Sequence, residues 1–307
     1  MKKSLPVLLL ILIAGAAPAA AQPAAVAAAR AYRRAHEREI IGELAALLAV
    51  PNVASDAPNI GRNAALIVEM LARRGVGARL LEHAGAPPVV YGELRAPGAT
   101  RTLVFYAHYD GQPVDPAEWV GGEPFRPVLR SGALEAGGRE VAPPAGGGRF
   151  DPEWRLYARS ASDDKAPIVA LLAALDALRA SRIGLTSNIK FFFEGEEEAG
   201  SPHLERIIAA HGDLLASDLW LICDGPVAQN REQQLYFGVR GVTSLELTVY
   251  GPRRELHSGH YGNWAPNPAM MLARLLATMK DDDGRVTVPG FYDGVEPLGE
   301  AERQALA

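Results

Sequence analysis

The chain has 307 residues, of which 48% are hydrophobic and 22% are charged. This composition is typical of a globular protein of one or two domains and excludes a disordered or fibrous chain. Its formal net charge is −5, and it becomes −7 without Lys2 and Lys3 (29 basic against 36 acidic residues), so a nucleic-acid partner is not expected.

The N-terminal stretch has the pattern of a secretory signal peptide. Lys2 and Lys3 precede an apolar run at residues 5–13, and small residues lead to Ala21. We expect residues 1–21 to be removed on export to the periplasm or outside the cell, and no membrane span in the mature chain. The single cysteine, Cys223, has no partner for a disulfide within the chain and is interpreted as a small buried residue rather than a reactive thiol.

The first part of the mature chain alternates helical and strand-like patterns. Apolar spacing predicts one long helix over residues 25–50 and a second over residues 62–74, followed by strands at 78–81, 89–94 and 103–107. Because helices that alternate with strands pack on both faces of a sheet, the predicted fold class is α/β.

The middle of the chain interrupts this pattern and then resumes it. Residues 111–152 are rich in Gly and Pro and predict a long surface loop. The pattern after the loop predicts helices at 167–181 and 202–210 and strands at 189–193 and 219–223.

The last part of the chain has a different character. Alternating apolar residues over 234–250 predict a half-exposed strand of another sheet, and residues 268–279 predict a helix. We place a domain boundary near Arg240–Gly241, which divides the mature chain into residues 22–240 and 241–307.

Acidic and imidazole side chains follow the predicted strands or open a predicted helix. They are His108 with Asp110, Asp163 with Asp164, Glu197 with Glu198, and Asp224. Each group alone has an ordinary explanation, such as a turn, a helix N-cap or a solvated helix start. The carboxyl ends of strands are, however, where open α/β sheets place their ligand sites.

Together these residues predict a metal site. One imidazole and several carboxylates suit zinc, and manganese or cobalt would also suit an oxygen-rich site. Because a pair of metals about 3.5–4 Å apart needs a bridging carboxylate, this number of carboxylates favours two metals over one. Asp110, two residues after His108, is placed to orient the imidazole by accepting a ring N–H.

Four ordered motifs and one isolated aspartate identify a family resemblance over the chain from about residue 25. The motifs are YAHYDGQP (106–113), LYARSASDDKAP (156–167), EGEEEAGS (194–201) and ELHSGHYG (255–262), and the aspartate is Asp224. The chain resembles the di-zinc metallopeptidases that include carnosinase-like dipeptidases, carboxypeptidase G, aminoacylase and succinyl-diaminopimelate desuccinylase, with the dipeptidase branch the best fit. The resemblance implies a zinc exopeptidase-like central mixed sheet flanked by helices, and a second α+β dimerisation or lid domain.

The resemblance also implies a role for each candidate in the first domain. Asp163 would bridge two zinc ions, His108 and Asp224 would complete one site, and Glu198 would serve the other. The family further implies a non-proline cis bond after Asp163.

Two more residues receive catalytic roles from the resemblance. Glu197 would be the general base, while Asp110 orients His108.

For the second domain, the resemblance implies that this domain pairs two subunits. His257 would then reach the partner's active site to polarise the scissile carbonyl or stabilise the oxyanion. We therefore expect His257→Ala to lower kcat strongly with metal content unchanged.

The match has departures. Ala158, Ser160 and Ala166 stand where the family usually has glycines, and no histidine follows His260, although the family supplies a last metal ligand there. We expect a truncated reading frame with an incomplete second domain, low stability and little activity.

The expected function is hydrolysis of peptide bonds in dipeptides or short peptides. An acylamino-acid deacylase or desuccinylase would use the same metal centre, and a non-catalytic binding protein or inactive truncated pseudo-enzyme would keep the scaffold without turnover. Glu197 argues against the last two, because a binding module needs no base beside its metal ligands.

Overall fold

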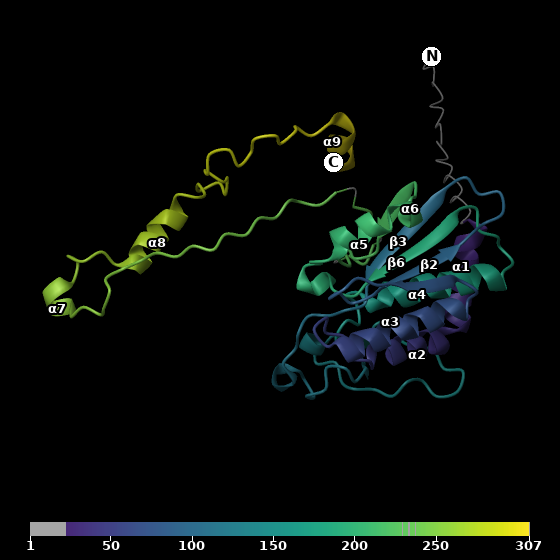
Figure 1. Ribbon diagram of the computed structural model, residues 1–307. Coiled ribbons are helices and arrows are strands. Elements are labelled where there is room, and N and C mark those ends of the chain that lie inside the picture. The colour runs from purple at the N-terminus through teal and green to yellow at the C-terminus, as the bar shows by residue number, and fades with distance from the viewer. Residues whose placement is uncertain (1–22, 229, 233, 237, 307) are drawn as a thin grey trace, which may run out of the picture. The chain divides into compact units, whose positions relative to one another are not determined.

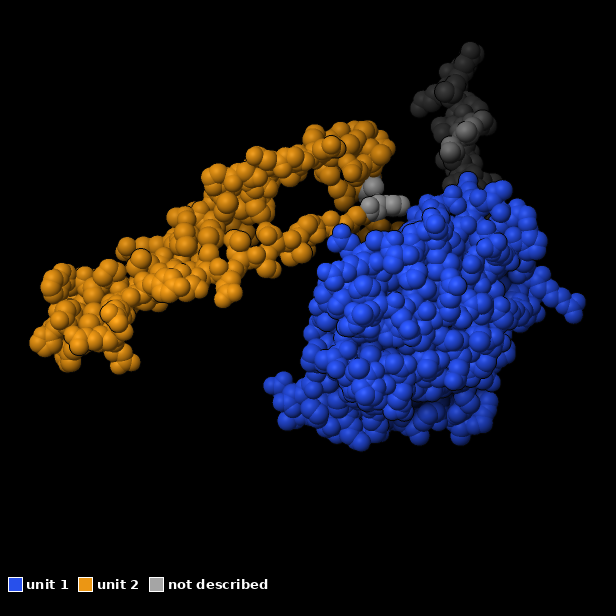
Figure 2. All heavy atoms as spheres, in the orientation of Figure 1, with its two compact units in different colours: residues 1–234 blue, residues 235–307 orange. Residues whose placement is uncertain are grey.

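The computed structural model describes residues 23–306 except 229, 233 and 237, so the predicted signal peptide lies outside the described residues. The chain divides into two compact units, residues 1–234 (unit 1) and 235–307 (unit 2), which Figure 2 colours separately. The division falls between residues 234 and 235, while the sequence predicted it near Arg240–Gly241. Each unit is described by itself.

Unit 1 is built on a five-stranded mixed sheet in the order β1-β2-β6-β3-β7. The strands are β1 (Gly77–Leu81), β2 (Val89–Leu94), β3 (Thr102–His108), β6 (Asn188–Glu194) and β7 (Leu219–Ile222). β1, β2 and β6 pair antiparallel in turn, whereas β3 runs parallel to both β6 and β7. The predicted mixed α/β sheet is confirmed, and the five strands predicted between residues 78 and 223 are present.

Helices cover both faces of this sheet (Figure 1). The helices of unit 1 are α1 (Ala24–Ala35), α2 (Glu37–Leu48), α3 (Ala57–Ala72), α4 (Lys165–Ala180), α5 (Leu204–Ala210) and α6 (Gly212–Leu215). Leu47, Ile67 and Leu172, from α2, α3 and α4, are fully buried in the core on one face. Ile207 and Leu215, from α5 and α6, form the core of the other face. The sheet is therefore fixed between two apolar layers, which leaves its strand ends to carry polar groups.

The single helix predicted over residues 25–50 is wrong, because the chain breaks between α1 and α2 at His36. His36 has φ −121° and ψ 25°, outside the helical region. Its Nδ1 lies 3.0 Å from the carbonyl oxygen of Tyr32, and its ring stacks on the Tyr32 ring with centroids 3.9 Å apart. A side chain that bonds locally to the backbone competes with the helix, and no glycine or proline marks the break.

The predicted loop over residues 111–152 holds more structure than expected. It contains the one-turn helices η1 (Pro116–Glu118) and η2 (Leu134–Ala136) and the strand β4 (Val128–Arg130). β4 pairs antiparallel with β5 (Arg155–Tyr157), which lies just beyond the loop. The Gly and Pro content concealed a strand of only three residues, too short for a periodic pattern.

Unit 2 contains α7 (Ser258–Tyr261), α8 (Pro268–Ala277) and α9 (Glu300–Leu306). The strand predicted over residues 234–250 is absent from its described residues, and Val242 and Leu245 are 95% and 70% exposed. A strand exists only by pairing, and the described residues of unit 2 form no neighbouring strand for it. In the part of the chain that the structure describes, no helix has the length and apolarity needed to cross a bilayer.

Candidate metal centre

The parallel strands bring the predicted polar residues to one edge of the sheet. His108 ends β3 and pairs in register with Glu194, which ends β6. Cys223, directly after β7, donates its backbone N–H to the carbonyl of Tyr106 at 2.9 Å, so Asp224 follows at the same edge. Segments far apart in the chain therefore meet where the sequence placed a ligand site.

His108, Asp163 and Asp224 form the tightest group at this edge. Each offers one potential ligand atom, and these three atoms lie within 4.8 Å of one another. His108 Nε2 lies 2.8 Å from Asp163 Oδ1 and 3.8 Å from Asp224 Oδ2. Glu197 Oε2 is also 3.8 Å from this nitrogen. Two predicted carboxylate ligands and the predicted base thus surround the Nε2 atom of a third predicted ligand, His108.

Asp110 is fully buried and contacts three of the predicted site residues. Its Oδ1 accepts the backbone N–H of Glu197 at 3.1 Å, and its Oδ2 accepts that of Glu198 at 3.0 Å. Oδ1 also lies 3.3 Å from His108 Nδ1. Asp110 thereby holds the 3₁₀ turn η3 (Glu197–Ala199) beside the imidazole ring.

The loop before α4 carries two aspartates with different surroundings. The peptide bond between Asp163 and Asp164 is cis, as the resemblance implied. The Asp163 side chain is 65% exposed and faces His108. Asp164 is buried, and its Oδ2 accepts the backbone N–H of His108 at 3.1 Å. Sequence reasoning treated Asp164 as half of a helix-cap pair and missed this contact, which joins residues 56 apart in the chain.

The site has an excess of negative charge. Burial raises the pKa of Glu197 and of Asp224, and it raises the pKa of Asp164 to about 8. For His108, burial opposes protonation, but the neighbouring carboxylates, Asp110 first, raise its pKa to about 10. Among the described residues, no Lys or Arg forms an ion pair with these carboxylates. One protonated imidazole therefore stands against several carboxylates, and the group keeps a net negative charge.

Two predicted residues lie outside the group. The Glu198 side chain accepts a hydrogen bond from Gln112 Nε2 at 2.7 Å, and in the described part of the chain it is not among the grouped ligand atoms. His257 belongs to unit 2, where its ring accepts the backbone N–H of Gly259 at 3.0 Å.

The residues fit a divalent metal. One imidazole nitrogen and carboxylate oxygens from Asp163 and Asp224 form a donor set that zinc accepts. A cation would also offset the excess of carboxylates, of which Asp224 has a pKa raised by burial. Asp163 and Asp224 are partly exposed, so an ion could enter from solvent.

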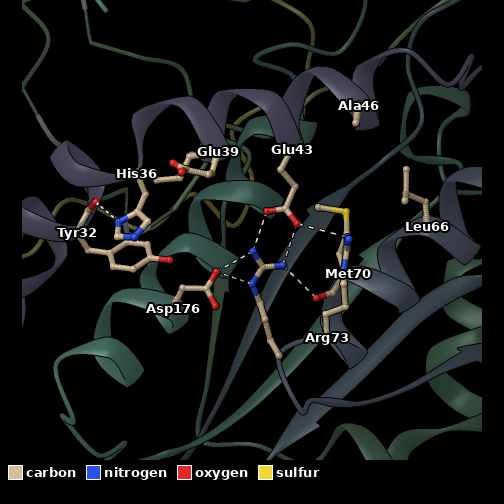
Figure 3. Close-up of a pocket in the computed structure, with 11 residues that line it drawn as sticks. Tyr32, His36, Glu39, Glu43, Ala46, Leu66, Met70, Arg73 and Asp176 are labelled. Carbon is tan, nitrogen blue, oxygen red and sulfur yellow. Dashed lines mark hydrogen bonds and ion pairs between the residues drawn. The ribbon is translucent and has the colours of Figure 1, made fainter. Parts of the chain in front are cut away.

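A second polar group lies among the helices of the same unit, in a hollow of about 520 Å³ (Figure 3). Arg74 donates to both carboxylate oxygens of Glu43 at 3.0 and 2.7 Å and to Asp176 at 2.8 Å. The side chains of Tyr32 and Met70 help to line the hollow. This group contains its own cation.

The chain is similar to known peptidases. Residues 104–239 match the profile of Peptidase family M20/M25/M40. The human Beta-Ala-His dipeptidase is 33% identical over 218 residues, which cover 70% of this chain and 39% of that protein. The Cys-Gly metallodipeptidase dug1 of Schizosaccharomyces pombe is 26% identical over 278 residues, or 86% of this chain and 54% of that protein.

Solved structures show the same likeness. An M20 family metallo-carboxypeptidase, Sso-CP2 from Sulfolobus solfataricus, superposes with a TM-score of 0.62 at 30% identity, over 87% of this chain and 55% of that one. Human carnosine dipeptidase 1 superposes with a TM-score of 0.60 at 26% identity, over 92% and 58%. The chain spans about half the length of the curated relatives it matches.

The mixed sheet, the motifs at its carboxyl edge and these matches agree: the chain belongs to peptidase family M20/M25/M40, on the dipeptidase side.

Proposed function

We propose that this protein hydrolyses peptide bonds in dipeptides or short peptides with the help of bound zinc. The observation that carries the proposal is the group of His108, Asp163 and Asp224, whose ligand atoms lie within 4.8 Å of one another in a chain of this family. The names of the relatives, a Beta-Ala-His and a Cys-Gly dipeptidase, support small peptides as the substrate class.

In this proposal His108, Asp163 and Asp224 hold one zinc ion, and Asp163 is shared with a second ion beside Glu198. Zinc bound there would supply a Lewis acid and make water acidic near neutral pH. The Asp163 side chain suits a shared role, since it is 65% exposed and one of its oxygens already faces His108 Nε2 at 2.8 Å. The Glu198 carboxylate accepts a hydrogen bond from Gln112 in this structure and would have to give it up to bind the metal.

Glu197 is the proposed general base. Its carboxylate lies next to the imidazole, and its pKa is raised by burial, which brings it closer to the working pH of a base. It takes a proton from the attacking water as the C–O bond forms. It then returns this proton to the nitrogen of the leaving amine as the C–N bond breaks.

Asp110 is proposed to position both partners of this step. Its two oxygens fix the backbone of Glu197 and Glu198, and its carboxylate faces the Nδ1 side of His108. A buried carboxylate on the far side of a ligating imidazole raises its basicity and fixes its orientation.

Export and pairing complete the proposal. The pattern of residues 1–21 supports a periplasmic or secreted protein. In unit 2, α8 exposes Met270, Met271, Leu275 and Leu276, which suits an interface with a second copy and a role for His257 there.

The function is tested with the purified protein and a panel of dipeptides and N-acyl amino acids. We expect the low activity predicted from the sequence to act on dipeptides in preference to the N-acyl compounds, to be lost after chelation, and to recover when zinc is added. Turnover that survives chelation, or turnover of N-acyl amino acids alone, would contradict the proposal.

A further inference from the structure

Asn52, in the loop between α2 and α3, contacts the loops that carry the residues of the candidate metal centre. The residue is fully buried. Its Nδ2 donates to the carbonyl of Tyr109 at 2.7 Å and to Oγ of Ser160 at 2.9 Å. Its backbone carbonyl accepts the N–H of Gly111 at 2.9 Å. One residue thus connects the helical layer to the loop that carries Asp110 and to the loop that carries Asp163.

Ser160 extends this contact to Asp110. Its hydroxyl accepts from Asn52 and donates to the carbonyl of Asp110 at 3.3 Å. The backbone of three consecutive residues, 109 to 111, is therefore held by Asn52 directly or through Ser160. Hydrogen bonds that are joined in a chain and buried together fix a loop more firmly than separate ones.

The packing around Ser160 leaves little freedom for this arrangement to shift. A Cβ atom on Gly111 would lie 2.3 Å from the Ser160 hydroxyl, so the two loops approach more closely than any side chain at 111 would allow. Ser160 itself has φ 61°, in the left-handed region that favours glycine. Its two hydrogen bonds help to hold the residue in that conformation.

The orientation of the Asn52 amide follows from its neighbours. The Tyr109 carbonyl can only accept, so the amide nitrogen must face it. Among the described residues the Oδ1 atom has no hydrogen-bond partner. A buried amide oxygen without a hydrogen bond destabilises the fold. The two hydrogen bonds of the amide nitrogen therefore explain why an asparagine occupies this position.

We propose that Asn52 is a positioning residue of the metal centre: it holds the backbone of Asp110, and Asp110 in turn holds the His108 ring and the backbone of Glu197. The contacts that carry this are the two bonds of Asn52 Nδ2 and the two bonds that Asp110 accepts from the η3 turn. The presence of zinc in this proposal rests on the proposed function. The chain of contacts from Asn52 to Glu197 does not depend on it.

The test compares Asn52→Ala with a matched control, Asn188→Ala. Asn188 also joins separate segments, since it accepts from the backbone N–H of Ala96 at 3.0 Å and donates to Thr102 Oγ1 at 3.3 Å. It lies at the start of β6, the end of the strand opposite to the site. Both variants lose amide contacts between separate segments, buried ones for Asn52 and partly buried ones for Asn188, and only the first loses contacts to the loops of the site.

Two measurements separate positioning from general stability. The zinc dissociation constant is measured by competition with a chromogenic chelator, and amide hydrogen exchange at Glu197 and Glu198 is measured in the metal-free protein. Asn52→Ala should weaken zinc binding about 10- to 100-fold, as loss of a group behind the ligands does, and should speed exchange at both amides. Asn188→Ala should match the wild type in both, whatever its melting temperature. Equal behaviour of the two variants would overturn the inference.

Ser160→Gly keeps the inference testable if Asn52→Ala does not fold. Glycine suits the positive φ of this position, so stability is expected to hold while the hydroxyl that joins Asn52 to Asp110 is lost. Zinc binding should weaken about 2- to 10-fold, the equivalent of one neutral hydrogen bond, and unchanged binding and exchange would overturn the inference. A wild-type protein that binds no zinc would refute the proposed function instead, and the exchange measurement would still decide the role of Asn52.

Discussion

The charged group among the helices and the charged group at the sheet edge differ in how their charges are balanced. Arg74 lies 2.7 Å from both Glu43 and Asp176, and the three side chains are 12%, 21% and 24% exposed. At the sheet edge, carboxylates surround the single imidazole of His108, and no Lys or Arg of the described chain pairs with them. Both groups are partly buried, but the first has a permanently charged guanidinium bonded to both of its carboxylates, whereas the second has one imidazole for several carboxylates.

The difference shows which group is structural. Arg74 donates in a fork to Glu43, so hydrogen bonds there are made within the protein and join α2 and α4 to the turn after α3. At the edge, burial is the main cause that raises the pKa values of Glu197 and Asp224, so their charged forms are disfavoured although His108 lies beside them. Unbalanced charge of this kind is typical of functional sites.

The largest expected effect is that of Glu197→Gln. The amide keeps the size of the side chain but cannot take a proton, so kcat for dipeptides should fall by about 10²- to 10⁴-fold. Zinc content, measured by atomic absorption, should stay at the wild-type value, because Glu197 is not a proposed ligand. Loss of zinc together with activity would make Glu197 a ligand and remove it as the base.

In the group of Arg74, Glu43 and Asp176, a substitution should change stability and leave zinc binding unchanged. Arg74→Met leaves Glu43 and Asp176 without a cation and should lower the free energy of unfolding by about 2–3 kcal/mol, less than for a fully buried pair because all three side chains are partly exposed. Zinc affinity should not change. Adding Glu43→Gln and Asp176→Asn should recover part of the stability in urea unfolding; a zinc defect in Arg74→Met would show that the two groups are not separate.

Tyr91 provides the smallest test, since its hydroxyl faces a carboxylate rather than a cation. It lies 3.3 Å from Glu93 Oε2, and burial, followed by the charge of Glu93, raises the pKa of Tyr91 to about 12. The unfolded chain therefore releases this proton first, and stability should fall as pH rises from about 10 to 12, by no more than about 2 kcal/mol. Tyr91→Phe should be nearly neutral at pH 7 and should lose this part of the pH dependence in thermal unfolding. The same slope in both proteins would assign the loss to other groups.

The sheet and the predicted ligands were accessible from the sequence because each lies within a short local pattern. Apolar runs end at charged residues, as at Phe193 and Glu194, so strand ends and polar clusters could be read together. The carboxyl edge of parallel strands then predicted that His108, Asp163 and Asp224 meet.

What the sequence did not predict depends on contacts between distant segments. Asn52 lies 57 residues from Tyr109 and 108 from Ser160, and nothing in its own neighbourhood marks it. Asp164 bonds to the backbone of His108, 56 residues away, and appeared to be a helix cap. The break at His36 arises from a side chain stacked on Tyr32, which no helix-breaking residue signals.

The central claim is that the unbalanced carboxylates at the sheet edge hold a metal ion. Its most direct test is equilibrium dialysis of the wild type and of Asp163→Asn against buffered zinc, since Asp163 is the carboxylate nearest to His108 Nε2. We predict at least one tightly bound zinc ion per wild-type chain. The variant should lose more than about 100-fold in zinc affinity, which is more than the loss expected when a residue that only supports a ligand is replaced. Equal zinc binding by the two proteins, or none by the wild type, would contradict the account.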